Sequence, residues 1–467
     1  MSKSDLSRRA FLAATTTTAA AVVSTRVNAA EVVPGKKSPN EKVPLAAIGG
    51  GGKGSADIWG CHKGGAEIVA IADPDWDRAG DMMSRFPDAK KFKDYRVMLD
   101  EFGENFDACT VTTPDHSHAP AAYQAMNLGK HVYVQKPLTH TIAEARLLAK
   151  TAKETGVVTQ MGNQGHCGDG VRDLCEMVWD GAIGQVKEAH IWTSRPVWPQ
   201  GILEPLPKEE IPKNMDWDLW IGPAQPRDYN KMYAPFNWRG WWDFGCGAIG
   251  DMACHIMDPT FWALKLYEAE GFSVEPLMVD CMNEQTAPLA STIKFEFPAR
   301  GDMDPVTVYW YDGKVWDPAT GSRSKQNFPK WPEHLPQVNE EKYYGDGANG
   351  SFFVGTDGVA TAGEYGGESR LLPAENMTDY TRPEKTLRRI KREDPYLEFI
   401  TAIKEGRKAV SDFSYASLLT ETANFGNVAL FAGSKLEWDS KAFKITNNED
   451  ANKYLTKEYR KGWELPC

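Results

Sequence analysis

The fold is decided by one stretch of ten residues, Leu45-Ala46-Ala47-Ile48-Gly49-Gly50-Gly51-Gly52-Lys53-Gly54. A short apolar run there ends in glycines with the spacing Gly49-x-Gly51-x-x-Gly54. This pattern is typical of a strand that ends at an anion-binding turn. Backbone N–H groups and the positive end of the following helix can then face a pyrophosphate, and glycine allows the close approach. A plain surface turn rich in glycine also matches this spacing, so the interpretation depends on the next residues of the chain.

A second apolar run, 66–72, comes after the turn and ends at Asp73. Dinucleotide-binding folds place an acid at about this distance, where it accepts hydrogen bonds from the adenosine ribose. The acid favours NAD over NADP, because a 2′-phosphate would face a carboxylate. Asp73-Pro74-Asp75 also fits a turn that caps a helix, and both roles can hold at once.

Length and charge limit the classes of function. A chain of 467 residues is too long for one ordinary core, so two domains are expected. The formal net charge of −11, with no cluster of lysine and arginine to offset it, argues against a nucleic-acid partner. No apolar run reaches the ~18 residues that a membrane span needs.

The first thirty residues predict an export signal. Ser7-Arg8-Arg9-Ala10-Phe11-Leu12 is a twin-arginine motif, and a mildly apolar run to Val23 and a small-residue end, Val27-Asn28-Ala29-Ala30, come after it. We expect 1–30 to be a twin-arginine (Tat) signal peptide that the Tat export machinery uses, which makes the protein periplasmic or otherwise exported. A basic disordered tail is the alternative.

The eight cysteines form no C-x-x-C pair and no compact framework. Four of them lie in apolar or helical surroundings and are expected to be small core residues: Cys61, Cys109, Cys175 and Cys254. We expect the fold to need no disulfide.

After a linker at 31–42, strand and helix patterns alternate as far as residue 161. Strands are expected at 45–49, 67–72, 107–112, 131–134 and 157–161, and helices at 54–62, 75–86, 117–128 and 142–155. The order predicts an N-terminal Rossmann domain over 43–161, with a doubly wound parallel sheet that binds ligands at the carboxyl ends of its strands. We therefore expect the cofactor-binding and catalytic residues of this domain at 49–54, 73, 112–118 and 135–137.

The pattern changes beyond residue 162, which opens a second domain over 162–467. A helix is expected at 170–180, strands at 185–193, 289–297 and 305–311, and packing helices near 396–403 and 418–429. Proline and tryptophan dominate 195–245, and a long loop is expected at 312–350. The strands predict an antiparallel, one-sided sheet that covers the first domain.

Two stretches carry candidate chemistry. Lys136 closes a strand just before Pro137, which holds the lysine near the nicotinamide end of the crevice, although a surface lysine before a turn is the alternative.

Asp251 and His255 are four residues apart, so both face one side of a helix. The carboxylate should hold the imidazole pKa near neutrality, ready to take a hydroxyl proton as the carbon loses hydride. Their apolar neighbours argue against an ordinary ion pair on a solvated face.

Asp258 lies one turn further along the same helical stripe and is followed by Pro259. Because proline removes a helix hydrogen bond, the helix is expected either to kink after Asp258 or to restart there with Asp258 as its cap.

Four motifs in order resemble the Gfo/Idh/MocA family over nearly the whole chain. They are the glycine turn at 49–54, Thr112-Thr113-Pro114-Asp115-His116-Ser117-His118, the run 129–138 with Gln135-Lys136-Pro137, and Gly247-Ala248-Ile249-Gly250-Asp251-Met252-Ala253-Cys254-His255. The resemblance implies an NAD(P)-dependent oxidoreductase that acts on sugars or cyclitols. It also implies a C-terminal α/β domain for substrate binding, whose large open and mostly antiparallel sheet often mediates oligomers.

By position, the resemblance implies that Lys136 hydrogen-bonds the reacting hydroxyl, that His255 is the general acid/base, and that Asp251 orients His255 or touches the substrate. One departure stands out: the family usually has glutamate where this chain has Gln135, so Lys136 lacks an adjacent carboxylate. The expected cofactor side comprises Gly49, Gly51, Gly52, Lys53, Gly54, Asp73, Thr113, Pro114, His118, Gln135 and Lys136. The expected substrate side comprises Lys136, Asn163, Arg239, Trp242, Asp251 and His255.

Asn163 is on the substrate side because it comes after the last strand of the first domain, at the domain junction, and Arg239 and Trp242 because they closely precede Asp251. The aromatic run Phe236-Asn237-Trp238-Arg239-Gly240-Trp241-Trp242 fits stacking on sugar faces, and its three tryptophans fit core packing equally well. His116 and His118 show no metal-site spacing, so no metal is expected.

The leading hypothesis is an exported oxidoreductase that acts on a sugar, glycoside or polyol hydroxyl and uses NAD, with NADP the less favoured cofactor. Because free NAD is scarce outside the cytoplasm, the cofactor should stay tightly bound and be recycled. A redox-assisted glycosidase, in which transient oxidation permits elimination of a glycosidic bond, and a non-catalytic sugar-binding protein are the alternatives. A homo-oligomer is expected.

Overall fold

A computed structural model describes residues 41–329, 345 and 347–467. The predicted signal peptide at 1–30 and most of the linker at 31–42 lie outside the described residues. Part of the predicted loop at 312–350 does so as well.

The first sheet has six parallel strands in the order β3-β2-β1-β4-β5-β6. They are β1 (Val43–Ile48), β2 (Ala66–Ala72), β3 (Lys90–Phe92), β4 (Ala108–Val111), β5 (His131–Val134) and β6 (Thr159–Met161). The predicted doubly wound sheet is confirmed, with the strand order reversing between β1 and β4. The sequence missed β3, because three residues are too few to show a pattern.

The helices of this half are α1 (Lys53–Gly64), α2 (Trp76–Arg85), α3 (Tyr95–Phe102), α4 (His118–Asn127) and α5 (Ile142–Thr155). Asp75 caps α2 by accepting a hydrogen bond from the Arg78 N–H, as its position suggested. Thr141 and Glu144 form a reciprocal capping box at the start of α5.

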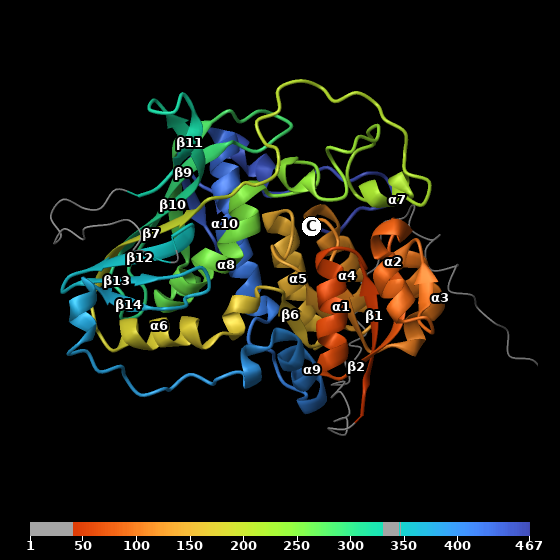
Figure 1. The fold of residues 1–467 in the computed structure, drawn as a ribbon, viewed down its shortest axis with the longest axis horizontal. Coiled ribbons are helices and arrows are strands. Elements are labelled where there is room, and N and C mark those ends of the chain that lie inside the picture. Colours follow the sequence, from red (N-terminus) through yellow and green to blue (C-terminus); the bar gives the residue numbers. More distant parts are fainter. Residues whose placement is uncertain (1–40, 330–344, 346) are drawn as a thin grey trace, which may run out of the picture. The chain divides into compact units, whose positions relative to one another are not determined.

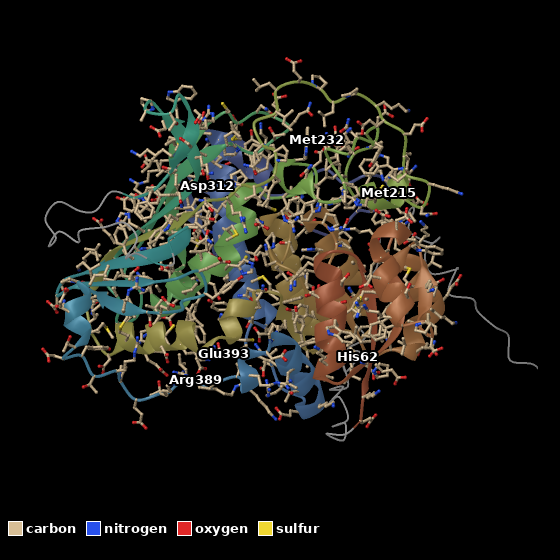
Figure 2. The ribbon with its side chains drawn as sticks, in the orientation of Figure 1. His62, Met215, Met232, Asp312, Arg389 and Glu393 are labelled. Carbon is tan, nitrogen blue, oxygen red and sulfur yellow. The ribbon has the colours of Figure 1, made fainter. Side chains whose placement is uncertain are left out.

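One helix from far along the chain completes this first core. Phe399, Ile400 and Ile403 of α9 (Pro395–Glu405) pack with residues of α1, β1 and β2. The segment before α9 is also tied to α6 (Asp169–Trp179), because Glu393 accepts a hydrogen bond from the Asp169 N–H and Arg389 pairs with Glu176 (Figure 2).

The second sheet follows the order β14-β13-β12-β7-β10-β9-β8-β15-β16, with β11 paired to β10. Its strands are β7 (Val186–Thr193), β8 (Gly271–Asp280), β9 (Ala290–Phe297), β10 (Val306–Asp317), β11 (Ser322–Gln326), β12 (Asn349–Gly355), β13 (Val359–Ala362), β14 (Arg370–Leu372), β15 (Leu436–Asp439) and β16 (Lys444–Ile445). All neighbours are antiparallel except β7 and β10. The mostly antiparallel sheet is therefore confirmed, and part of the predicted loop at 312–350 is instead the β10–β11 hairpin.

Helices separate this sheet from the first one. The buried residues of β9 and β10 alternate with half-exposed ones, as a one-sided sheet requires. However, α8 (Gly247–Ala263) and α10 (Phe413–Ala432) pack on the sheet, and α10 also packs against α5 (Figure 1). The expectation that the sheet itself covers the first domain is thus wrong.

The proline- and tryptophan-rich region forms a small core of its own, which includes the short helix α7 (Trp217–Ile221). Met215 lies in this core and Met232 packs against it (Figure 2). Trp217, Trp220 and Trp241 are buried with them.

All eight cysteines are among the described residues and are free. Cys61, Cys109, Cys175 and Cys254 are buried, which confirms their prediction as core residues. No helix in the described ranges has the length and apolar character needed to cross a membrane.

Candidate active site

The glycine turn comes directly after β1, and two of its glycines are required by close backbone packing. Gly49 has a φ of 92°, and a Cβ there would lie 2.4 Å from the Thr112 carbonyl oxygen. A Cβ on Gly54 would lie 2.3 Å from the Gly49 carbonyl oxygen. Gly54 therefore packs directly against the turn. Because α1 begins at Lys53 without a side-chain cap, its N-terminus is open to an anion.

Asp73 stands at the end of β2 beside this turn. Its Oδ2 accepts a hydrogen bond from the Gly50 N–H at 2.8 Å, and its Oδ1 accepts one from the Asp75 N–H at 2.8 Å. Burial raises its pKa to about 6, although these two hydrogen bonds oppose the shift. The glycines and the acid together fit NAD, because they leave backbone donors for a pyrophosphate and a carboxyl for a ribose hydroxyl.

A cleft of about 630 Å³ runs from the glycine turn to α8. It brings together nearly all the residues predicted for the cofactor side, namely Gly49, Gly51, Gly52, Lys53, Asp73, Thr113, Pro114, His118, Gln135 and Lys136. Asp251, His255 and Arg239, predicted for the substrate side, line the same cleft.

Lys136, at the end of β5, binds Asp251 of α8. Its Nζ donates to Oδ1 of Asp251 at 2.7 Å and to the Asp251 backbone carbonyl at 2.7 Å. Each side chain is 12% exposed, so the pair is largely withdrawn from water. The expectation that Lys136 lacks a carboxylate partner is wrong: replacing glutamate by Gln135 removes one acid, but Asp251 supplies another.

Arg239 adds a second cation to the same carboxylate. Its Nε donates to Oδ1 of Asp251 at 3.1 Å, and its guanidinium lies 4.2 Å from the centre of the Trp238 ring. Burial pushes the pKa of Asp251 upward, but Lys136 and Arg239 outweigh burial and hold it below its usual range. Asp251 is thus a permanent anion that fixes two cations.

His255 behaves differently from its predicted role in two respects. No hydrogen bond joins it to Asp251 in the described structure, and its Nδ1 is buried without a partner there. Its pKa is well below the usual value, because burial and the nearby Lys136 ammonium outweigh the attraction of Asp251. The imidazole is therefore neutral at neutral pH, and Nε2 is the nitrogen left to meet a substrate. Tyr365 packs edge-on against the ring, with 5.2 Å between ring centres.

Asp258 neither caps nor breaks the helix. The helix α8 continues through Pro259 to Ala263, because nearly all of its residues are buried and tertiary packing holds it. The Asp258 carboxylate instead accepts hydrogen bonds from Asn163 at 3.2 Å and from the Tyr415 hydroxyl at 2.6 Å, and it lies 3.0 Å from Nδ1 of His166.

Two predicted substrate residues lie outside the cleft. Asn163 is 1% exposed and is held by Asp258 and Ser411 behind the site. Trp242 donates to the Asn283 carbonyl and packs on Phe431, with 4.6 Å between ring centres. Both corrections have the same cause: proximity along the chain does not set the direction of a side chain.

The two histidines of the 112–118 motif have structural partners. Nδ1 and Nε2 of His118 each lie 2.8 Å from a carbonyl oxygen, those of Pro137 and Thr113, and burial lowers its pKa to about 4. His116 Nε2 lies 2.9 Å from the Ile221 carbonyl, away from the cleft. No group of three or more metal-ligating side chains occurs in the part of the chain that the structure describes.

Sequence reasoning assigned no role to several lining residues. They include Arg78, Asp115, Gln164, Arg195 and Tyr365. Phe236 is 44% and Tyr365 37% exposed, so aromatic faces are open at the substrate end. No local pattern marks these residues, since they come from α2, from loops and from the edge of the second sheet.

Asp115 is the most unusual of these residues. It is 4% exposed, and its Oδ2 accepts a hydrogen bond at 3.1 Å from the Cys246 N–H, just before α8. Burial raises its pKa to about 7, although Arg239 and Lys136 lower it. At the substrate end of the cleft, Asp251 therefore stays charged, whereas Asp115 can carry a proton near neutral pH.

Solved structures share the fold. A levoglucosan dehydrogenase in complex with NADH and levoglucosan matches with a TM-score of 0.55 and 17% identity, covering 85% of this chain and 99% of that one. The WlbA dehydrogenase of Bordetella pertussis, in complex with NADH and UDP-GlcNAcA, matches with a TM-score of 0.58 and 15% identity, with the same coverage.

Sequence relatives match over shorter stretches. The scyllo-inositol 2-dehydrogenase (NAD(+)) of Bacillus subtilis is 30% identical over 121 residues, 26% of this chain and 35% of that protein. A glycosyl hydrolase family 109 protein of Shewanella pealeana is 28% identical over 205 residues, 39% of this chain and 44% of that protein. The matches thus span less than half the length of these curated relatives.

Two family models match the two halves of the cleft in order. The NAD-binding Rossmann fold of the Gfo/Idh/MocA oxidoreductase family matches residues 44–163, and the C-terminal alpha/beta domain of the same family matches 183–297. Because these models together match just over half of the chain, the protein belongs to the Gfo/Idh/MocA oxidoreductase family.

Proposed function

We propose that the protein uses NAD to oxidise or reduce a hydroxyl-bearing carbon of a sugar, glycoside or polyol. The observation that carries the proposal is the Lys136–Asp251 pair, which joins the cofactor half of the cleft to the substrate half next to His255. The named relatives support the substrate class, because they are an inositol dehydrogenase and a levoglucosan dehydrogenase.

The side chains divide the work. Bound NAD supplies the hydride acceptor. The Lys136 ammonium uses two of its donors on Asp251, so its third can hydrogen-bond the reacting hydroxyl oxygen. Neutral His255 receives the hydroxyl proton at Nε2 as the alcohol is oxidised, and returns it in the reverse reaction. Phe236 and Tyr365 offer flat surfaces to the C–H faces of a sugar ring.

The test is direct. Purified protein with NAD is incubated with inositols, anhydrosugars, hexoses and glycosides, and NADH formation is followed by its absorbance. We expect activity with at least one polyol or sugar and its loss in His255→Ala. Turnover that is unchanged in His255→Ala would overturn the assignment, and binding of sugars without turnover would favour the non-catalytic alternative.

A redox-assisted glycosidase is the second candidate, favoured by Asp115. Oxidation of one hydroxyl acidifies the neighbouring C–H; a base takes that proton, the glycosidic C–O bond breaks, and the returned hydride restores the alcohol after water adds. This sequence needs a second proton-handling group besides His255, and Asp115 lines the same cleft. The similarity to a glycosyl hydrolase family 109 protein supports it as well. Release of an aglycone without net NADH, with solvent deuterium entering the sugar, would distinguish it from a dehydrogenase.

We further propose that the protein is exported by the Tat pathway and carries its NAD with it. The support is the twin-arginine sequence at 1–30 and the scarcity of NAD outside the cytoplasm. We expect the purified exported protein to release NAD(H) when it is denatured. Exported protein that releases no nucleotide would contradict the proposal. Arg8→Lys/Arg9→Lys should retain the protein in the cytoplasm.

We also propose a homo-oligomer built on the open sheet, which light scattering of the purified protein would test.

A further inference from the structure

The buried carboxylate of Asp57, on α1, lies beneath the cofactor side of the cleft. It is 0% exposed and does not line the cleft itself. Gln135 donates its Nε2 hydrogens to both carboxylate oxygens, at 3.1 and 2.9 Å. The Thr112 hydroxyl donates to Oδ2 at 2.8 Å.

Two further donors complete the cluster. The Tyr396 hydroxyl, from α9, donates to Oδ1 of Asp57 at 2.8 Å, and Lys53 Nζ lies 3.0 Å from the same oxygen. Lys53 also donates to the Tyr396 hydroxyl at 2.9 Å. One carboxylate thus receives hydrogen bonds or an ion pair from four residues: Lys53 of the same helix, and Thr112, Gln135 and Tyr396 from distant parts of the sequence.

Three of these partners line the cleft: Lys53 at the glycine turn, Thr112 at the end of β4, and Gln135 at the end of β5. Gln135 directly precedes Lys136, so fixing its side chain fixes the strand end that carries the reactive lysine. Gly162 leaves the room that this arrangement needs, because a Cβ there would lie 2.5 Å from Nε2 of Gln135.

We propose that Asp57 is a positioning residue and that Asp57 and Gln135 form an obligate acid–amide pair that holds Lys136 and Lys53 in place for the cofactor. The amide is required at position 135 because the acid is already at position 57. Asp57 touches neither substrate nor cofactor and acts through its partners. The inference rests on the NAD-binding part of the proposed function and is independent of the substrate.

The pair predicts a charge conflict that can be relieved. In Gln135→Glu, two carboxylates would meet at about 3 Å in a buried place, where both cannot ionise together. One must hold a proton or the strand end must move. Asp57→Asn/Gln135→Glu exchanges the acid and the amide, which restores a single charge and lets the amide at position 57 donate to the carboxylate at position 135.

The experiment measures the dissociation constant of NADH by fluorescence, and the Tm, for the wild type, both single variants and the double variant. We expect Gln135→Glu to bind NADH at least about tenfold more weakly, equivalent to ~1.4 kcal/mol, with partial recovery at acidic pH. The double variant should return to within about threefold of the wild type and recover most of the lost Tm. Because no substrate is used, an incorrect substrate proposal would leave this result untouched.

Gln164→Glu is the matched control. Gln164 lines the same cleft but makes no hydrogen bond with Asp57 in the described structure, so Asp57→Asn should not rescue it. A double variant no better than Gln135→Glu, or equal rescue of Gln164→Glu, overturns the proposal. NADH binding and Tm that are unchanged in Gln135→Glu overturn it too.

Discussion

Lys136 and Asp251 are 115 residues apart, yet two hydrogen bonds of 2.7 Å join them across the cleft. One of these bonds goes to the side chain of Asp251 and the other to its backbone, so the lysine is held to the helix itself. Arg239 shares the same carboxylate oxygen, at 3.1 Å. This arrangement fixes the Lys136 ammonium where the cofactor side of the cleft meets the substrate side.

Asp251→Asn should impair catalysis more than folding. The amide loses the negative charge that orients Lys136 and Arg239, and a misplaced reactive group typically costs ~100-fold in rate. We expect kcat to fall by about that factor, with a smaller change in the dissociation constant of NADH. Asp243→Asn, which breaks the Arg227–Asp243 pair outside the cleft, is the control and should retain kcat. Equal losses in both variants would show that Asp251 has only a structural role.

His255 should stay in its neutral form through mildly acidic pH. Its pKa is lowered by burial and by the Lys136 ammonium, so the base remains available as pH falls through the usual histidine range. We therefore expect that protonation of His255 does not lower kcat/KM near pH ~6.5, the usual pKa of histidine. A limb there that disappears in His255→Asn would contradict the assigned environment.

The parts of this fold that obey local rules could be predicted from the sequence. The glycine spacing and the alternation of apolar runs with helices indicated the first sheet, because strand and helix periods are properties of a few adjacent residues. The apolar patterns at 289–297 and 305–311 likewise indicated β9 and β10. The sequence predicted no strand at β3, at β8 or from β11 to β16, most of which are too short to show a pattern.

The partners of the charged residues could not be predicted in the same way. Helical spacing correctly placed Asp251 and His255 on one helix, but it could not show that Lys136 and Arg239 would take the carboxylate. Such pairing is decided by packing between segments far apart in the chain. The same holds for Asp57, whose partner Tyr396 is 339 residues away.

Asp115 should make stability fall as pH rises from mildly acidic to neutral. Its pKa is raised from 3.8 to about 7, mainly by burial, so between these values the native state keeps a proton that the unfolded chain releases. The native state then binds more protons than the unfolded chain, so the unfolding free energy decreases by up to about 1.4 kcal/mol for each pH unit. Above the native pKa this contribution is constant.

Asp115→Asn should flatten that dependence, because the amide cannot ionise. Urea unfolding near pH ~5 and ~8 measures it, and the variant should lose less stability between the two than the wild type does. Asp73, with a pKa of about 6 in the native state, contributes in the same direction and remains in the variant. An identical pH slope in both proteins would mean that Asp115 ionises normally in the cleft.

Replacing the glycines of the turn by alanine should lower the unfolding free energy by different amounts. Gly49→Ala sets a Cβ 2.4 Å from a backbone oxygen at a φ of 92°, and neither strand end can move away easily. At Gly52, with a φ of 58°, the nearest atom is the far end of the flexible Arg78 side chain. Because a φ of 58° with a ψ of −117° is a strained conformation for any residue but glycine, we expect Gly52→Ala to cost about 1–3 kcal/mol and Gly49→Ala to cost more. Gly80→Ala, on α2 with no atom within 4 Å, should stabilise slightly because alanine favours helices. If Gly49→Ala unfolded at the same denaturant concentration as Gly80→Ala, the turn would not be packed against the end of β4.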